Sequence, residues 1–200
     1  MVLFVVGYLV AAARYPGGSR LDPQHVGYAH LANFWCDLLD GTAYNGQPNP
    51  GRPIALAATW LLPLSLLPLW FTLPRLWPRT SRTRWVVPAF GTLAMAAMIG
   101  VTTRYHDQAI TLGALAAGIA LGALLWQLYA VRLKALLLTG ALAATAGACD
   151  YAAYVGGASA HLLPGLQKVA GVALLGWLWH LTTAGATLWP DRSWSRFKEP

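Results

Sequence analysis

The chain alternates between long apolar runs and short segments rich in Pro, Gly, Asn and Arg. Apolar runs of about 20 residues are typical of helices that cross a membrane, and the intervening residues are those that end helices. The first run is short for a span, and Pro63 and Pro68 are expected to kink the second. The pattern predicts six spans, over residues 1–13, 54–73, 85–103, 109–130, 135–155 and 166–189.

The segment between the first two runs departs from this alternation. In HLANFWCDLLD, residues 30–40, the polar residues His30, Asn33, Asp37 and Asp40 are separated by three or four positions. On a helix such positions share one face. We therefore expect an amphipathic or re-entrant helix over about residues 25–40, with its polar stripe facing a shared pocket rather than open water.

Composition supports a membrane protein. Of the 200 residues, 56% are hydrophobic and only 10% are charged, which is typical of an all-α polytopic protein with one membrane domain over residues 1–200. The formal net charge is +7, but the basic residues lie in short clusters between the apolar runs. Such clusters indicate topology and contact with lipid headgroups. Nucleic acid is not an expected partner, because the sequence has no basic-patch fold motif.

The basic residues also predict an orientation. If six spans alternate, nine Lys and Arg residues lie on one side and five on the other. Because the more basic side faces the cytoplasm, we expect an inner-membrane protein with both termini cytoplasmic. The first group is Arg75, Arg79, Arg82, Arg84, Arg132, Lys134, Arg192, Arg196 and Lys198, and the second is Arg14, Arg20, Arg52, Arg104 and Lys168.

This topology gathers polar residues on the outer side. They are His25, His30, Asn33, Asp37, Asp40, His106, Asp107, Asp150 and His161. Asp150 lies within the apolar sequence ATAGACDYAAYV, and an ionisable residue inside a span is a functional candidate. Thr102 precedes His106 by four positions, so both side chains are expected to face one pocket.

These residues predict a polar site at the outer leaflet. Structural alternatives stay open, since Asp107 can cap a helix and Asp150 can pair with Arg104 or Lys168. A carboxylate or imidazole would activate water, with or without a divalent metal ion. The assignments are Asp37, His106 and Asp150 to catalysis; His30, Asn33, Arg104 and Asp107 to substrate binding; and His30, Asp37 and His106 to a metal ion.

His180 and the two cysteines do not predict a cofactor. His180 lies deep in the sixth run with no second histidine at matching depth, so a hydrogen bond to a neighbouring helix, through Thr182 or Thr183, is favoured over haem ligation. Cys36 and Cys149 both lie toward the outer side, and a disulfide between them stays an open alternative.

Two motifs carry a resemblance that covers nearly the whole chain. YPGGS…NFWCDLLD followed by YHDQAITLGALAAG resembles bacterial six-helix membrane proteins without an assigned activity, allied to the DRAM/Frag/Sfk group. The resemblance implies a polar helix after the first span with an acidic residue near Asp37, and a histidine, His106, opening a later span. It also implies a link to lipids, because eukaryotic relatives are associated with lipid-anchor remodelling and autophagy.

A second, narrower resemblance involves the alkaline ceramidase and adiponectin-receptor membrane hydrolases. Thr102-x-x-x-His106 is similar to their Ser-x-x-x-His motif. Their late His-x-x-x-His pair is missing here, because His180 has no histidine four residues away. A three-histidine zinc site of that pattern is therefore not expected.

Three functions remain open from the sequence. The first is a lipid-directed hydrolase or remodelling protein, with or without a metal ion. The second is a non-catalytic lipid-binding protein or an accessory subunit that contacts other membrane subunits. The third is a small transporter, which is disfavoured because no paired repeat halves are visible.

Overall fold

The protein is described by a computed structural model, which defines residues 1–76, 81–159 and 161–188. These residues contain no strand, only isolated bridges between Gly17 and Val26 and between Thr42 and Pro48. The all-α prediction is confirmed, and the helices begin and end within a few residues of the predicted runs; Trp189 and the basic tail lie outside the described residues. The elements are α1 (Val2–Ala13), η1 (Cys36–Leu39), α2 (Arg52–Thr72), η2 (Leu73–Leu76), α3 (Thr83–Gly100), α4 (His106–Ala130), α5 (Lys134–Val155) and α6 (Leu163–Leu188).

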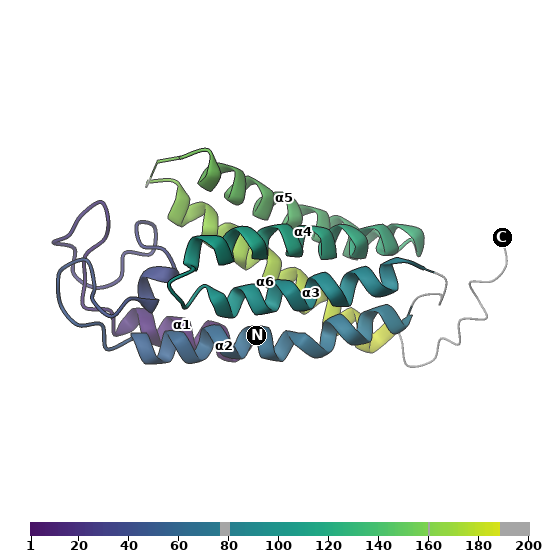
Figure 1. Cartoon of the computed structure of the whole chain (residues 1–200), viewed down its shortest axis with the longest axis horizontal. Helices are drawn as coiled ribbons and strands as arrows, with labels where there is room; N and C mark the ends of the chain where they lie inside the picture. The colour runs from purple at the N-terminus through teal and green to yellow at the C-terminus, as the bar shows by residue number, and fades with distance from the viewer. Residues whose placement is uncertain (77–80, 160, 189–200) are drawn as a thin grey trace.

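The helices form an elongated bundle (Figure 1). Helices α2, α3 and α4 pack in sequence order, α1 packs on α2, and α5 packs on α4 and α6. Helix α1 is only 12 residues long, about 18 Å, so it covers one half of the bundle. Among the described helices, α6 approaches only α5 closely. Side chains and open space therefore separate α6 from α1, α2, α3 and α4.

Among the helices that the structure describes, three are long and apolar enough to cross a membrane: α2, α4 and α5. Their outward faces carry large apolar side chains; Leu142, Leu138 and Leu115 are 70%, 65% and 59% exposed. So much exposed apolar surface is unfavourable in water but suits contact with lipid chains. The chain is therefore a membrane protein, as its composition predicted.

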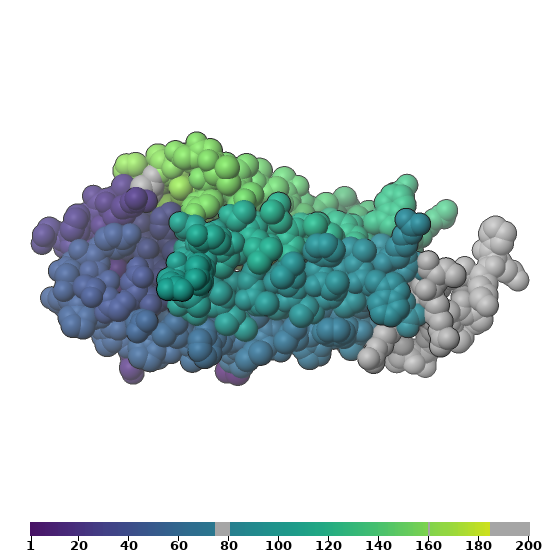
Figure 2. All heavy atoms as spheres, in the orientation of Figure 1, coloured from purple at the N-terminus to yellow at the C-terminus, as the bar shows by residue number. Residues whose placement is uncertain are grey.

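Residues 14–51, here called the loop cap, cover one end of the bundle (Figure 2). Glycine is required where the cap folds back on itself. Gly18 has a φ of +81°, and a Cβ atom there would lie 2.6 Å from the backbone nitrogen of Asn45. The YPGG sequence thus allows two distant parts of the cap to approach each other closely.

The predicted helix over residues 25–40 is wrong. Within this range only Cys36–Leu39 is helical, as the short 3-10 helix η1. The reason lies in its polar side chains, which bond to nearby backbone groups and so compete with a helix. The Asn33 side chain accepts from the Ala29 nitrogen at 2.9 Å, and Asp37 accepts from the Phe34 nitrogen at 2.8 Å. The spacing of three and four residues between these polar side chains therefore reflects a compact set of turns and not a helix.

The loop cap joins the bundle where Gly51 precedes α2, and this contact gives a first prediction. A Cβ atom on Gly51 would lie 2.4 Å from the backbone oxygen of Ala11, at the end of α1. Because backbone cannot move aside cheaply, Gly51→Ala should cost about 1–3 kcal/mol of stability. Gly41→Ala is the matched control, since a Cβ there meets nothing within 4 Å. Thermal unfolding in detergent measures both, and equal midpoints would contradict the prediction.

Candidate functional site

A buried polar cluster forms the centre of the loop cap. Asn33 is fully buried and Asp37 is 5% exposed. The Asn33 side chain donates to the Gly18 oxygen at 3.1 Å and to Asp37 Oδ2 at 3.0 Å. Together with the contact from the Ala29 nitrogen, these bonds use both N–H donors of the Asn33 amide and one of the two lone pairs on its oxygen. Asn33 and Asp37 therefore hold the cap together and do not line the two cavities described below.

Helix α6 anchors this cluster to the bundle. Gln167 Oε1 accepts from the Trp35 nitrogen at 2.9 Å, and the Lys168 ammonium donates to the Asn33 backbone oxygen. The same ammonium lies 5.6 Å from the centre of the Tyr28 ring. Burial raises the pKa of Asp37, and the hydrogen bonds from Asn33 and Phe34 oppose that rise.

An apolar cavity of about 290 Å³ lies inside the bundle, where α6 stands apart from the other helices. Its wall is built by α1, α2, α3, α4, α6 and the loop cap. Trp35 and His106 contribute at the loop-cap end, and Trp70 and Leu121 contribute deeper in the bundle. The Nε1 atom of Trp70 is buried without a hydrogen-bond partner among the described residues. The cavity is therefore long and almost entirely apolar.

A second, polar cavity of about 360 Å³ lies beside it, between the loop cap and the α3–α4 turn. We call it the polar pocket. It is lined by Asp40, Gly41, Arg52, Thr102 and Thr103 together with the four residues that it shares with the apolar cavity: Cys36, Leu39, Val101 and His106. Thr102 and His106 thus face one pocket, as their spacing predicted. The shared wall makes the two cavities adjacent parts of one amphiphilic site.

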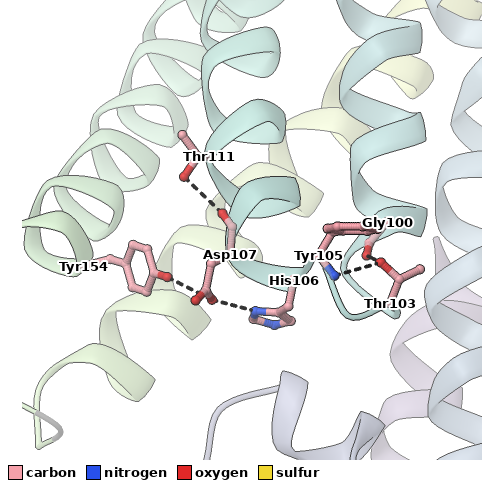
Figure 3. A network of polar contacts seen from close by, with 7 residues as sticks. All are labelled: Gly100, Thr103, Tyr105, His106, Asp107, Thr111 and Tyr154. Carbon is pink, nitrogen blue, oxygen red and sulfur yellow. Dashed lines mark hydrogen bonds and ion pairs between the residues drawn. The ribbon is translucent and has the colours of Figure 1, made fainter.

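His106 is the first residue of α4, and its partner is its sequence neighbour (Figure 3). His106 Nδ1 lies 3.1 Å from Asp107 Oδ1, and the same carboxylate oxygen accepts from the Tyr154 hydroxyl at 3.2 Å. Since an ionised carboxylate only accepts, Nδ1 carries the hydrogen of this contact, and a neutral ring then has its lone pair on Nε2. The Asp107 side chain is 78% exposed, so this pair contributes little to stability. It can orient the imidazole beside both cavities.

The other predicted site residues lie apart from this site. His30 is exposed, 5.1 Å from the Tyr28 ring centre, and Arg104 donates to the Tyr105 hydroxyl at 2.7 Å. Asp150 is half-buried on α5, with no side-chain hydrogen bond or ion pair within the described ranges. No three His, Cys, Asp or Glu residues among those described are placed to hold a metal ion, so His30, Asp37 and His106 form no such group.

The structure also shows the surroundings of His180 and of the two cysteines. His180 Nδ1 lies 3.3 Å from the Thr139 hydroxyl, so the predicted bond to a neighbouring helix is confirmed with a different partner. Thr182 and Thr183 instead donate to the Trp179 oxygen of their own helix. Cys36 and Cys149 are free thiols, so the disulfide alternative is wrong.

Sequence reasoning missed Arg52 and Trp70 as site residues. Arg52 follows a turn rich in Asn, Pro and Gly, and it was used only to predict the orientation of the chain in the membrane. Its position at the start of α2 is the signal that places it at the loop cap. Trp70 belongs to an aromatic-rich helix end that is typical of any membrane protein. Only the packing of α6 away from α2 shows that it lines a cavity.

No family model, curated protein or solved structure matches this chain. The resemblance to the DRAM/Frag/Sfk group therefore stays a prediction. Two adjacent cavities, one apolar and one lined by the charged residues Asp40 and Arg52, are the features of this structure that bear on function.

Proposed function

We propose that this membrane protein holds a lipid-like amphiphile, with an apolar chain in the bundle cavity and a polar head in the polar pocket. The observation that carries the proposal is the shared wall of the two cavities. An apolar space that meets a charged space is complementary to a molecule with one apolar and one polar end. Such molecules are plentiful in the membrane that surrounds the protein.

The size of the cavity supports a single chain. An engineered cavity of about 150 Å³ holds benzene, so about 290 Å³ accommodates roughly a dozen carbon atoms. Along α4 the wall runs from His106 to Leu121, 15 residues or about 22 Å. Half of a bilayer's apolar core is about 15 Å thick. The cavity therefore suits one acyl or isoprenoid chain drawn from a single leaflet.

The proposal includes an orientation. Arg82 and Arg84 at the start of α3, and Arg132 and Lys134 between α4 and α5, lie at the end opposite the loop cap (Figure 1). This asymmetry favours a cytoplasmic location for that end and an outer location for the loop cap. The six helices would then insert in the inner membrane with both termini cytoplasmic, and the polar pocket would open toward the outer leaflet.

Trp70 provides a test, because it is 4% exposed and bulk lipid cannot reach its ring. A lipid brominated along its acyl chain should quench Trp70 fluorescence, measured as the difference between the protein and Trp70→Phe. Ala117→Phe places a ring in the cavity and should remove most of this quenching. Ala148→Phe, the same change on an exposed position of α5, should leave it intact. Quenching that is absent, or insensitive to Ala117→Phe, would reject a lipid in the cavity.

The His106–Asp107 pair favours lipid hydrolysis as a second candidate. His106 Nε2 can take a proton from water as its oxygen attacks an ester carbonyl, and the imidazolium can then protonate the departing alkoxide. Asp107 would position the ring and stabilise its charge, as an orienting carboxylate does. His106 borders both cavities, so it lies where the head of a bound lipid joins its chain.

A further inference from the structure

The polar pocket contains charges of both signs that do not neutralise each other. Arg52 and Asp40 both line it, yet they form no ion pair within 4 Å in the described part of the chain. Arg52 uses Nε to donate to the Leu39 oxygen at 2.9 Å. Its two terminal nitrogens have no protein partner among the described residues, so they remain free to bind a ligand.

Asp40 is similarly available. Its backbone is held, since the oxygen accepts from the Asn49 side chain at 3.0 Å. Its carboxylate receives no hydrogen bond from any residue in the described ranges. Burial raises the pKa of Asp40, while the charges of His106 and Arg52 lower it, which places all three groups in one electrostatic environment.

The helix ends add a positive field to the pocket. Arg52 is the first residue of α2 and His106 the first residue of α4, so two helix N-termini meet this pocket. Neither has a side-chain cap. Helix N-termini favour anions, and an arginine fork favours phosphate. The pocket thus combines a phosphate-binding side with a carboxylate that suits a cation.

We propose that the head of the bound amphiphile is a phosphoethanolamine group, with its phosphate on Arg52 and its primary ammonium on Asp40. The inference rests on the proposed lipid function and names the class of lipid. A primary ammonium is chosen over a quaternary one because it donates hydrogen bonds to a carboxylate. A quaternary ammonium is instead bound by aromatic rings, and no Phe, Tyr or Trp of the described residues lines the polar pocket.

The test compares three single-chain probes with the same acyl chain in detergent: lysophosphatidylethanolamine, lysophosphatidylglycerol and monoacylglycerol. The protein should bind the first about tenfold more tightly than the second, and the third most weakly. Asp40→Asn should lower affinity for the ethanolamine probe alone. Arg52→Gln should lower affinity for both phosphate probes, and should bring lysophosphatidylglycerol to the level of monoacylglycerol. Arg52→Lys should fall between, because it keeps the charge and loses the fork.

The controls are Asp22→Asn and Arg20→Gln, which change exposed charges of the loop cap outside the pocket and should alter no affinity. Thermal unfolding of each variant shows that it is folded. Equal affinity for all three probes, or a preference that Asp40→Asn leaves unchanged, overturns the headgroup assignment and leaves lipid binding intact. Failure of every probe to bind rejects the proposed function itself, so the two failures are distinguishable.

Discussion

Replacing Asp37 with alanine is expected to lower the free energy of unfolding by about 2–4 kcal/mol. The carboxylate is buried and accepts from both Asn33 Nδ2 and the Phe34 nitrogen. Alanine leaves both donors without this partner. For a chain of this size the loss corresponds to a fall in unfolding midpoint of roughly 4–16 °C. Thermal unfolding in detergent measures it, with Asp22→Ala as the exposed control.

Asp37→Asn separates geometry from charge. The asparagine oxygen can accept from the same two donors, so most of the stability should remain. Burial raises the pKa of Asp37 above its ordinary 3.8, so the folded state binds a proton more tightly than the unfolded state. Stability should therefore rise as pH falls from the raised value toward 3.8. Asp37→Asn should weaken this dependence, leaving the part due to Asp40, whose pKa burial also raises.

A small loss for Asp37→Ala, equal to that of Asp22→Ala, would contradict the structural role. A loss of lipid binding without a loss of stability would return Asp37 to the functional site. The sequence assigned it to catalysis because its spacing from His30 and Asn33 suggested one helical face. The structure instead uses Asp37 to accept hydrogen bonds from Asn33 and Phe34 within the loop cap.

Helix positions were predictable because each depends on a local property. An apolar run bounded by turn residues must satisfy its backbone N–H and C=O groups with hydrogen bonds. A helix forms these bonds within one segment. Residues 109–130 illustrate this, since they form all but the first turn of α4. Membrane insertion is more demanding than helix formation, and by length and composition only α2, α4 and α5 meet that condition among the described helices.

The site was only partly predictable because it depends on long-range packing. Thr102 and His106 were placed in one pocket because they are close in sequence. Arg52 and Asp40 meet His106 only after α2 has packed on α3 and the loop cap has closed over both. The periodicity of the sequence does not predict this long-range packing. The cavity beside Trp70 depends likewise on the course of α6, which among the described helices packs closely only on α5 and crosses behind the others in Figure 1.

The hydrolase candidate predicts the largest effect on rate. If His106 is the general base, His106→Ala should reduce ester hydrolysis by about 10²–10⁴-fold. The assay is the release of free fatty acid from lysophosphatidylethanolamine by the purified protein in detergent. His25→Ala is the matched control, because His25 is exposed and, among the described residues, forms hydrogen bonds only through its backbone. A protein that binds the probe without hydrolysing it would exclude this candidate and leave lipid binding in place.

Asp107 should act as a positioning residue, and its substitution should have kinetic effects of its own. Asp107→Asn presents an amide that can donate to Nδ1 and so hold the wrong tautomer of His106. We expect a fall in kcat with little change in KM, because Asp107 contributes to neither cavity wall. Asp107→Glu should restore part of the rate, since it keeps the acceptor. The exposure of the pair predicts almost no change in unfolding midpoint. A midpoint that falls together with the rate would instead assign the pair to structure.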